Sequence, residues 1–438
     1  MNSLVFSIVL SLMILGGNDR ANTDSPWRTG VISPRMETLQ KQLQRGNSTA
    51  VDQFWEEMKS RSTPLVEEIP TDSKHVLVTF LYRAVQPATN VVLYNQLNAS
   101  RDESTNVLTR LPGTDVWYKT YWIRNDMRLS YSLVPNPNED SLDSNKPELR
   151  LQDPLNPKSL STGSAMGRSV LELPAAPAQP WIKPNPAIPG RELEEINIDS
   201  KILKTRRQAW IYTPPGYNLR SSSPYPLLIC FDGFVYATPE FVPTPTILDN
   251  LITAKEIQPM VAVFIGQSPQ PGRNIELTNN EPFLAYVADE LLPKVREKWH
   301  ATSNPAQTVV CGSSSGGHAS AFFAFRRPDV FGNVLSQSGA FWPGQTHEPE
   351  KPDREWLIRQ FALSPRLPIR FVLQVGVLEF IATPRNGPSI LATNRHLHDV
   401  LTKKGYDIYY SEIAGGHEPL SWRGGIAEGL IRLLGSTK

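Results

Sequence analysis

One short turn constrains the fold of this chain more than any other feature: residues 312–316 read Gly-Ser-Ser-Ser-Gly. An apolar run at residues 308–311 precedes the turn, and a run of small and aromatic residues at 318–325 follows it. A strand, a Gly-x-Ser-x-Gly turn and a helix in this order are typical of a nucleophile elbow, in which the serine is raised above a sheet. We therefore expect Ser314 to be a nucleophile, with a flexible Gly/Ser-rich loop as the alternative interpretation.

The overall charge of the chain is close to neutral. Its 438 residues contain 44 Lys and Arg against 43 Asp and Glu, which gives a formal net charge of +1. This balance gives no electrostatic reason to expect a nucleic-acid partner or binding to an anionic membrane surface. A chain of this length is expected to form two or three domains.

The residues that commonly bind metals are few and scattered. The two cysteines, Cys230 and Cys311, lie in apolar runs that predict neighbouring strands, so we expect small buried side chains rather than a disulfide. The seven histidines show no His-x-x-x-His or His-Glu-x-x-His spacing. The sequence therefore predicts no structural zinc site, and we expect no metal and no cofactor.

The N-terminus carries an apolar run at residues 4–15. Its length suits the hydrophobic region of a signal peptide and is too short to span a bilayer, and no other segment predicts stable membrane insertion. We therefore predict a signal peptide at residues 1–22 and a periplasmic or exported protein. No Lys or Arg precedes the run and no Ala-x-Ala site follows it, so a simple tail or an incorrectly assigned start codon is the alternative.

The first half of the chain predicts a small domain at residues 30–165. Two amphipathic helix patterns come first, and Ser33 followed by Pro34 is a typical helix start. Short runs rich in β-branched and aromatic residues then recur at close spacing, with turn residues between them. This spacing is typical of a β-sandwich. The Pro-rich residues 166–192 predict a linker to a second domain.

In the second half, residues 193–438, predicted strands alternate with helices. The clearest helix spans residues 282–299, with Asn280 as its N-cap and Pro293 as the cause of a kink. The alternation predicts a mostly parallel sheet with helices on both faces. Together with the Gly-x-Ser-x-Gly turn, it predicts an α/β-hydrolase fold preceded by the smaller N-terminal β-sandwich domain.

The chain order after the elbow supplies the partners that a nucleophilic serine needs. In α/β-hydrolases the serine, the acid and the histidine follow one another in that order. His417 lies in a Gly-Gly-His loop directly after a predicted strand, at the sheet edge where Ser314 is also expected. Glu379 follows the preceding predicted strand and is the first choice for the acid. The alternatives are Asp399, Asp407 or a Ser–His dyad without an acid.

Two backbone N–H groups are expected to stabilise the negative charge that develops on the attacked ester oxygen. The first is the N–H of Ser315, directly after the nucleophile. The second should come from the Asp-Gly-Phe turn after the apolar strand at residues 227–231, where Gly233 and Phe234 are the candidates. A plain Asp-Gly turn is the alternative interpretation of that segment.

The chain resembles the enterochelin (ferric enterobactin) esterase family over most of its length after the N-terminal run. In the second half the resemblance rests on the elbow and on RNIELTNN at 273–280, ELLP at 290–293, FGNVLSQSG at 331–339 and GGH at 415–417. In the first half it rests on FW at 54–55, TPLVE at 63–67, TFLYR at 79–83, LPGTDVW at 111–117 and DPLNP at 153–157. These strings are far more specific together than any one of them alone.

The resemblance implies an N-terminal β-sandwich that helps to cover the site, and a hydrolase domain of the esterase-D type. It implies as substrate an iron-loaded catecholate siderophore with a trilactone of serine esters, whose own catecholates hold the iron. It also suggests an aromatic and basic rim around the substrate, made by Arg128, Tyr131, Arg273, Phe234 and Trp342, with His318 as a further pocket residue. Members of the family usually act in the cytoplasm, so a cytoplasmic location is the alternative to export.

Other functions are also compatible with the sequence. An exported esterase of the esterase-D type could act on acyl or feruloyl esters of carbohydrate, with the β-sandwich as a carbohydrate-binding-like module. A non-catalytic binding protein could keep the fold, but the presence of both Ser314 and His417 argues against it.

The chain differs from many members of the family at two positions. It has Glu418 where they carry Asp, and His318 where they often carry an apolar residue. The sequence gives no oligomeric state.

Overall fold

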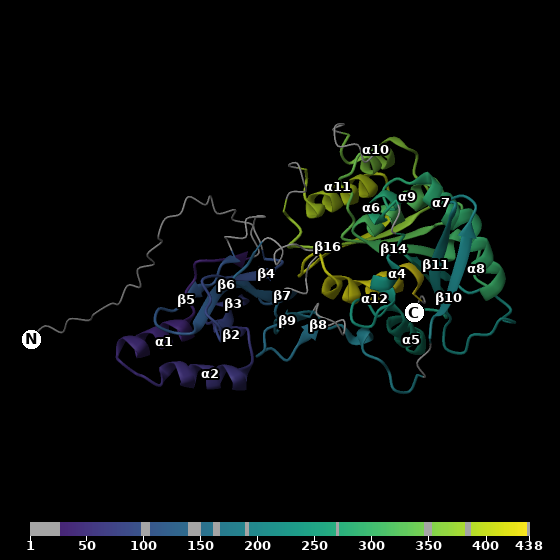
Figure 1. Cartoon of the computed structure of the whole chain (residues 1–438). Helices are drawn as coiled ribbons and strands as arrows, with labels where there is room; N and C mark the ends of the chain where they lie inside the picture. The colour runs from purple at the N-terminus through teal and green to yellow at the C-terminus, as the bar shows by residue number, and fades with distance from the viewer. Residues whose placement is uncertain are drawn as a thin grey trace, which may run out of the picture.

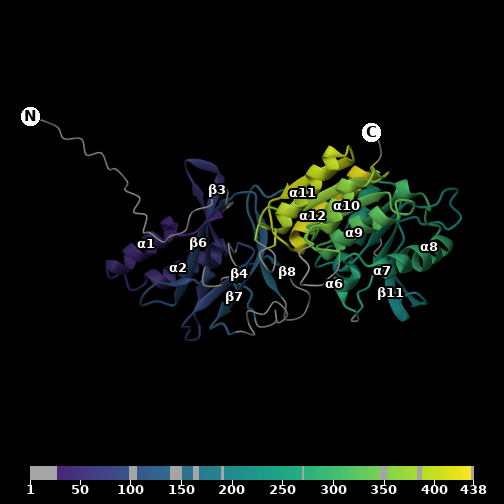
Figure 2. The ribbon, with the colours of Figure 1, turned by 90° about the horizontal axis from the view of Figure 1, so that it is seen from above.

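The computed structural model describes residues 27–97, 106–138, 150–160, 167–188, 192–268, 271–345, 353–381 and 387–435. Two domains lie side by side along the long axis of the molecule, the N-terminal domain in purple and blue and the C-terminal domain in teal to yellow (Figure 1). Figure 2 shows the same arrangement from above. The predicted signal peptide lies outside the described residues.

In its described residues, the N-terminal domain contains two helices and two β-sheets. One sheet has the order β1-β6-β3-β2, with β5 paired to β6, and the other has the order β4-β7-β9-β8. Large apolar side chains from both sheets, such as Phe80, Tyr121 and Leu133, share one buried core, as expected for a β-sandwich. The bounds of the elements are β1 (Trp27–Arg28), α1 (Pro34–Gln44), α2 (Ala50–Arg61), β2 (Leu65–Ile69), β3 (Asp72–Arg83), β4 (Val91–Asn95), β5 (Thr109–Arg110), β6 (Val116–Arg124), β7 (Arg128–Pro135), β8 (Ser159–Leu160) and β9 (Arg168–Glu172).

The boundary between the domains differs from the prediction. Strand β9 lies inside the predicted linker of residues 166–192, yet it pairs antiparallel with β7, with Leu171 opposite Leu129. Both leucines are buried in the sandwich core. The predicted linker is therefore wrong at its start. The Pro-rich composition of this segment indicated a linker, whereas β9 forms because it pairs with β7. The connecting segment begins after β9 and contains the short 3-10 helix η3 (Pro180–Ile182).

The C-terminal domain is built on an eight-stranded sheet with the order β10-β11-β13-β12-β14-β15-β16-β17. Strands β10 and β11 form a hairpin that joins the sheet antiparallel, and the remaining strands are parallel. Cys230 and Cys311 lie opposite each other as buried free thiols, which confirms their predicted role as small core residues. The bounds are β10 (Glu194–Ser200), β11 (Thr205–Tyr212), β12 (Leu227–Cys230), β13 (Val261–Ile265), β14 (Thr308–Ser313), β15 (Asn333–Gln337), β16 (Arg370–Gly376) and β17 (Asp407–Ile413).

Helices cover both faces of this sheet, which confirms the predicted α/β-hydrolase fold (Figure 1). The core on one face includes residues of α8, α9, α10 and α11, and the core on the other face includes residues of α4, α5 and α12. The bounds are α4 (Gly233–Ala237), α5 (Thr244–Thr253), α6 (Arg273–Glu276), α7 (Glu281–Ala285), η4 (Tyr286–Leu291), α8 (Leu292–Trp299), η5 (Pro305–Gln307), α9 (Ser315–Arg326), α10 (Trp356–Leu363), α11 (Ile390–Lys403) and α12 (Pro419–Leu434).

The helix predicted for residues 282–299 forms with the expected cap and an interruption. The Asn280 side chain accepts a hydrogen bond from the Phe283 N–H at 2.8 Å. Between α7 and α8 the helix widens into the π-helical turn η4, directly before the turn that contains Pro293. Proline has no N–H and its ring crowds the carbonyl four residues earlier, so the wider turn accommodates it without breaking the helix.

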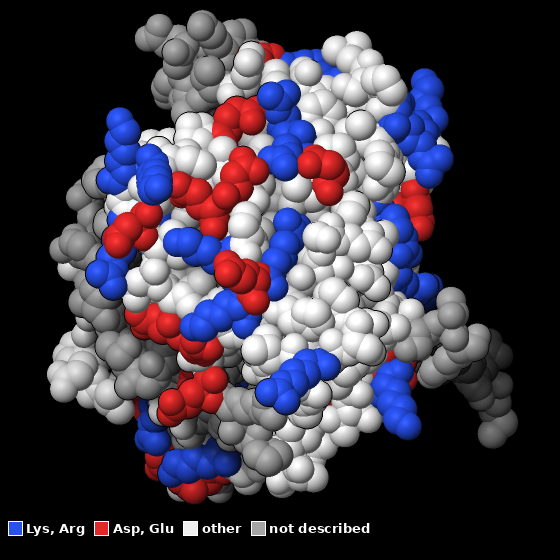
Figure 3. All heavy atoms as spheres, turned by 90° about the vertical axis from the view of Figure 1, so that its right-hand side faces the viewer, with Lys and Arg blue, Asp and Glu red and all other residues white. Residues whose placement is uncertain are grey.

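The end of the hydrolase domain that is farthest from the sandwich carries mixed charges. Figure 3 shows basic and acidic side chains interspersed on this face. Exposed ion pairs contribute to the pattern, such as Lys298 of α8 with Glu194 of β10. A face with both signs of charge offers no extended positive potential for a polyanion, in agreement with the net charge of +1.

In the part of the chain that is described, no helix is both long enough and apolar enough to cross a membrane.

Candidate active site

The elbow lies between β14 and α9. Ser314 has φ 58° and ψ −121°, a backbone conformation that is strained for a residue with a side chain. Its N–H donates to the Gln337 carbonyl at 3.0 Å, and its carbonyl accepts from the Ala340 N–H at 2.9 Å. A Cβ at Gly312 would lie 2.7 Å from the carbonyl carbon of Gly316. The turn therefore requires glycine at this position.

Four adjacent parallel strands end at the same edge of the sheet. Strands β14, β15, β16 and β17 follow one another in the sheet order. Ser314 follows β14, Ser338 follows β15, Glu379 comes shortly after β16, and His417 comes shortly after β17. This carboxyl edge is where open α/β sheets bind their ligands. The sheet topology thus brings three predicted catalytic residues to one edge.

Glu379 and His417 form a short hydrogen bond, with 2.6 Å between Glu379 Oε2 and His417 Nδ1. The Glu379 side chain is 2% exposed. Its Oε1 accepts hydrogen bonds from the Gly376 N–H at 2.7 Å and from the Ser338 hydroxyl at 2.6 Å. These bonds hold the carboxylate in one orientation. A carboxylate at Nδ1 favours the tautomer whose Nε2 lone pair can accept a proton.

Two residues that the sequence did not single out support this pair. Ser338 donates to Glu379 and accepts a hydrogen bond from Trp422 Nε1 at 3.0 Å. The Trp422 ring also packs edge-on against His417, with 5.3 Å between ring centroids. The position of Ser338 directly after a predicted strand was the one sequence signal that could have indicated its role. No sequence pattern around Trp422 indicated a role for that residue.

The two alternative acids have other partners. Asp399 is exposed and contacts the neighbouring His398, and Asp407 is exposed and pairs with Arg370 at 2.7 Å. Glu379 is therefore the acid that the structure brings to His417.

Potential metal ligands are dispersed. Within the described ranges, no three His, Cys, Asp or Glu side chains are grouped so that they could hold a metal ion.

The loop that carries His417 is also held by the sandwich domain. Glu418 is 1% exposed, and its carboxylate accepts hydrogen bonds from the Ser130 N–H at 3.1 Å and from the Ser130 hydroxyl. The Arg128 N–H donates to the Ala414 carbonyl at 3.1 Å. Burial raises the pKa of Glu418 above its ordinary value, although the hydrogen bonds from Ser130 oppose this shift. The sequence did not predict this contact between the domains.

The turn after β12 carries the candidate donors for the oxyanion. Asp232 has φ 55°, and α4 begins at the next residue. A Cβ at Gly233 would lie 2.8 Å from the carbonyl carbon of Phe264, so the backbone approaches β13 too closely for a side chain. Ser315 is the first residue of α9, and Gly233 and Phe234 are the first residues of α4. The first N–H groups of a helix have no partner within it and can donate to a ligand.

Arg273 connects this turn to the elbow. Its Nε and one terminal nitrogen bind the two oxygens of buried Asp232 at 2.6 and 2.5 Å. The same terminal nitrogen donates to the Ser313 carbonyl at 3.3 Å. A bidentate pair of this kind fixes the orientation of both partners. Arg273 was predicted at the substrate rim, and its side chain is partly exposed. However, its guanidinium is bonded to Asp232 and so stabilises the turn after β12.

The other predicted substrate residues differ in exposure. Phe234 is 60% exposed and Trp342 is half-buried, so both keep surface for a ligand. Tyr131 is 1% exposed and donates its hydroxyl hydrogen to Asp153, and His318 is 0% exposed. The prediction that Tyr131 and His318 bind the substrate is wrong, because the strand and the helix that carry them direct these side chains into the core.

The predicted role of Arg128 is also wrong. Its guanidinium is buried and bound by Glu172 at 2.5 Å and by the Pro177 carbonyl at 2.8 Å. It lines a cavity between the domains that Ser314 and His417 do not line. The backbone of Arg128 contacts the catalytic loop, whereas its side chain does not form a free cation at a substrate rim.

Comparison with known proteins gives matches over both domains. The family model described as "Putative esterase" matches residues 200–433, and the model described as "Enterochelin esterase, N-terminal" matches residues 77–182. The iron(III) enterobactin esterase of Escherichia coli O6:H1 is 33% identical over 341 residues, which cover 74% of this chain and 81% of that protein.

Two solved structures are similar over nearly their whole length. The enterobactin esterase from Shigella flexneri, solved in the presence of enterobactin, has a TM-score of 0.67 at 29% identity and covers 85% of this chain and 96% of its own. The ferric enterobactin esterase from Salmonella typhimurium has a TM-score of 0.70 at 28% identity, with 86% and 98% covered. An endo-1,4-beta-xylanase/feruloyl esterase of Xylanibacter ruminicola is a more distant match, 24% identical over 43% of this chain.

Proposed function

The chain belongs to the enterochelin esterase family, and from this premise we propose that it hydrolyses the ester bonds of an iron-loaded catecholate siderophore such as ferric enterobactin. The enzyme is a hydrolase that acts on ester bonds. The observation that carries the proposal is the 2.6 Å hydrogen bond between His417 and Glu379, at the sheet edge where the elbow presents Ser314.

Ser314 is the nucleophile in the first step. Its oxygen attacks the ester carbonyl carbon, and His417 Nε2 accepts its proton. The Glu379 carboxylate stabilises the imidazolium that forms. The carbonyl oxygen becomes negatively charged and accepts hydrogen bonds from the N–H of Ser315 and from the first turn of α4 at Gly233 or Phe234. The loss of one such donor typically costs about 3–4 kcal/mol of transition-state stabilisation.

The second step releases the product. As the lactone C–O bond breaks, the His417 imidazolium gives its proton to the departing serine oxygen of the substrate. The siderophore's carboxyl group is then bound to Ser314 as an ester. His417 then accepts a proton from water as the water oxygen attacks this ester, and it gives that proton to the departing Ser314 oxygen, which frees the enzyme. Each cycle consumes one water and yields one carboxylic acid and one hydroxyl group. The iron is part of the substrate and stays with its catecholates.

Aromatic side chains near the elbow suit the catechol rings. The exposed ring of Phe234 belongs to the turn that also supplies the oxyanion donors, and Trp342 follows the segment in which Ala340 contacts the elbow. Aromatic rings of a ligand pack well against such side chains in offset or edge-on geometry. We therefore assign Phe234 and Trp342 to the substrate rim.

The apolar run at residues 4–15 supports export. If the protein is exported, the form isolated from the cell envelope should begin near residue 23 when its N-terminus is sequenced. An intact N-terminus on protein found with the cytoplasmic fraction would contradict export and leave the proposed hydrolysis unaffected.

A substrate panel tests the proposed function. The full-length protein should convert ferric enterobactin into linear, shorter catecholate products that chromatography separates, and Ser314→Ala should lose this activity while it stays folded. The same preparation should act far more slowly on feruloylated sugars. Turnover of a feruloylated sugar with ferric enterobactin left intact would replace the siderophore proposal with a carbohydrate esterase.

A further inference from the structure

Two glutamines lie side by side at the edge of the sheet that carries the catalytic residues. Gln337 of β15 and Gln374 of β16 are paired in the sheet, and both side chains are 0% exposed. They follow Leu335 and Val372 by two residues, so their side chains enter the same core, which the sheet shares with α4, α5 and α12. A buried amide is unfavourable unless its hydrogen-bonding groups are paired, so the partners of these two side chains are informative.

The amide of Gln337 joins two helices to the sheet. Its Oε1 accepts a hydrogen bond from the Tyr236 hydroxyl of α4 at 2.9 Å. Its Nε2 donates to Gln374 Oε1 and to the Trp422 carbonyl of α12, both at 2.9 Å. Gln374 Nε2 in turn donates to the Gly425 carbonyl of α12 at 3.0 Å. A Cβ at Gly425 would collide with Gln374 Oε1, so glycine lets α12 approach this pair.

The hydroxyl of Tyr236 anchors the helix that follows the oxyanion turn. Tyr236 comes three residues after Gly233, within one turn of α4, and its side chain is 0% exposed. Burial raises the pKa of Tyr236 well above its ordinary value, so the hydroxyl stays protonated and donates to Gln337. The backbone carbonyl of Gln337 accepts a hydrogen bond from the Ser314 N–H at 3.0 Å. One residue of β15 therefore contacts both the nucleophile and α4.

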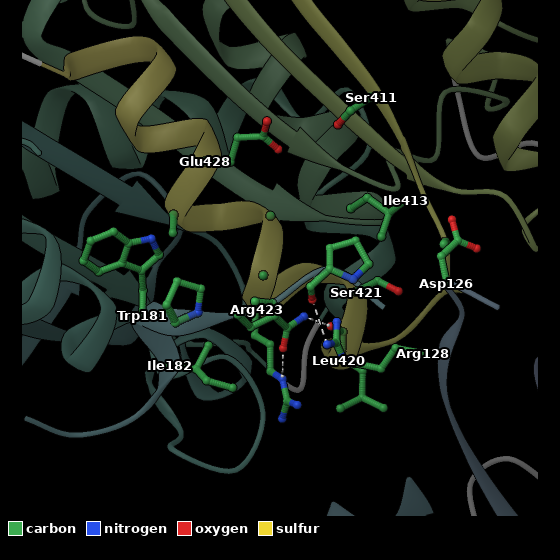
Figure 4. Close-up of a pocket in the computed structure, with 18 of the residues that line it drawn as sticks. Asp126, Arg128, Trp181, Ile182, Ser411, Ile413, Leu420, Ser421, Arg423 and Glu428 are labelled. Carbon is green, nitrogen blue, oxygen red and sulfur yellow. Dashed lines mark hydrogen bonds between the residues drawn. The ribbon is translucent and has the colours of Figure 1, made fainter. Parts of the chain in front are cut away.

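The same amide also reaches the base side of the active site through α12. The Trp422 carbonyl accepts a hydrogen bond from Gln337. The Trp422 indole N–H donates to Ser338, the residue that also binds the catalytic acid. Figure 4 shows the neighbouring residues Ser421 and Arg423 of α12 at a cavity between the domains. Trp422 instead contacts the sheet, so the Gln337 amide fixes the face of α12 that is turned toward the catalytic residues.

We propose that Tyr236 and Gln337 are positioning residues for ester hydrolysis. Their hydrogen bond holds the backbone N–H groups of the turn after β12 in a fixed place relative to Ser314. Donors of this kind stabilise the developing oxyanion most when they are in position before the charge forms. Both side chains are buried, so they act through the backbone and do not contact the substrate. This inference rests on the proposed serine mechanism, not on which ester the enzyme cleaves in the cell.

The variant Tyr236→Phe tests this role, because it removes only the hydroxyl group. We expect kcat/KM for p-nitrophenyl acetate to fall about tenfold, since a small displacement of a donor weakens its bond to the oxyanion. Tyr212→Phe is the matched control, because the Tyr212 hydroxyl donates to Asp249 at 2.7 Å in the same core. The control variant should lose stability in urea unfolding and keep wild-type kinetics. Equal values of kcat/KM for the two variants would overturn the proposal.

A boronic acid separates a displaced oxyanion donor from general damage to the fold. The Ser314 oxygen adds to the boron of phenylboronic acid and forms a negatively charged tetrahedral adduct, which resembles the transition state. The inhibition constant of this acid should rise about tenfold with Tyr236→Phe, in proportion to the loss of kcat/KM. The pH profile of kcat/KM, which reports the catalytic base of the free enzyme, should keep its midpoint. Unchanged inhibition or a shifted pH profile would overturn the proposal.

A double-mutant cycle tests whether the two residues act through one bond. Gln337→Met keeps the length of the side chain and removes the amide, and it should lower kcat/KM about 10- to 100-fold. The addition of Tyr236→Phe should cause no further loss, because the bond is already absent, and additive losses would overturn the proposal. If these effects are seen while ferric enterobactin stays intact, the proposed siderophore substrate fails and this inference stands. Undiminished cleavage of p-nitrophenyl acetate by Ser314→Ala would remove the serine mechanism and this inference with it.

Discussion

The nucleophile side and the base side of the active site are held in different ways. Ser314 is fixed within the hydrolase domain, by backbone hydrogen bonds with Gln337 and Ala340. The loop of His417 is fixed from both domains, because the adjacent Glu418 binds Ser130 of the sandwich. The geometry of the nucleophile is therefore a property of one domain, whereas the geometry of the base depends on how the two domains meet.

The glycines on the two sides show the same difference. A side chain at Gly312 would collide with the backbone of Gly316 at 2.7 Å, and this backbone forms the elbow itself. A side chain at Gly416 would collide with the side chain of Gln96 from the sandwich at 2.8 Å. Of these two neighbours, only the Gln96 side chain can be removed by mutation, because the Gly316 neighbour is backbone. We expect defects on the base side to be repairable from the other domain and defects on the nucleophile side not to be.

The largest effect is expected for Glu379→Gln. The variant keeps the shape of the side chain but no longer stabilises the imidazolium or holds the productive tautomer of His417. The kcat for ester hydrolysis should fall by about 10³–10⁴-fold, as measured by steady-state kinetics. Asp399→Asn is the matched control and should retain wild-type activity. A loss of less than tenfold for Glu379→Gln would indicate that a Ser–His dyad suffices.

Gly312→Ala should have the next largest effect. The added methyl group displaces the elbow and moves the Ser314 hydroxyl, and a displacement of about 1 Å can lower the rate about 10²-fold. The value of kcat/KM should fall by this factor, and Gln96→Gly in the same chain should not restore it. Recovery in the double variant would contradict the independence of the nucleophile side.

Gly416→Ala should give a smaller and repairable defect. The added methyl group pushes the His417 loop away from Gln96, and we expect about a tenfold loss of kcat/KM. The partner variant is Gln96→Gly, because the nearest atom of Gln96 is its own Cβ, at 2.8 Å, which alanine would keep. Gln96→Gly alone should be nearly neutral. The double variant should recover to within about threefold of wild type, since a double-mutant cycle reports coupling between contacting residues. Simple additivity of the two changes would show that the sandwich does not position this loop.

Glu418→Gln should have the smallest effect on activity at neutral pH, about threefold in kcat. Its effect on stability should depend on pH. Since the folded pKa of Glu418 is raised by burial, the native state holds this proton more tightly than the unfolded state does. The stability contributed by Glu418 is then fully present below its ordinary pKa of 4.5 and falls as pH rises through the folded value. The stability advantage of wild type over Glu418→Gln should therefore shrink with rising pH in urea unfolding.

Glu412→Gln is the matched control for this pH dependence. The hydrogen bond from Arg395 lowers the pKa of Glu412, so its stabilising contribution is present above the ordinary pKa and is lost as pH falls. The difference between wild type and this variant should shrink toward low pH, the opposite of the trend for Glu418. The same sign for both variants would contradict the buried environment of Glu418.

The fold class and the position of the elbow could be predicted because they depend on local patterns. Apolar runs alternating with helix patterns indicate a parallel sheet, and glycines around Ser314 indicate a turn that excludes side chains. The order of Ser314, Glu379 and His417 along the chain also placed them after strands that prove to be close neighbours in the sheet. Local sequence and chain order were sufficient for these features.

The contacts between the domains could not be predicted from such patterns. Strand β9 is defined by its pairing with β7, and the bond between Ser130 and Glu418 joins residues 288 positions apart. Tyr131 and Arg128 were expected at the substrate rim because they are aromatic and basic, but tertiary packing places one in the core and pairs the other with Glu172. Residue type indicates what a side chain can bind, and only the three-dimensional packing decides what it faces.

Trapping of the acyl-enzyme tests the central claim most directly. The protein should be mixed with ferric enterobactin, quenched in acid within the first turnover, digested and examined by mass spectrometry. We predict an added mass equal to that of the intact cyclic siderophore on the peptide that contains Ser314, because opening the lactone on Ser314 releases no group, and no such adduct for Ser314→Ala. Undiminished hydrolysis by Ser314→Ala, with no adduct on this peptide in the wild-type protein, would contradict a covalent mechanism at the elbow.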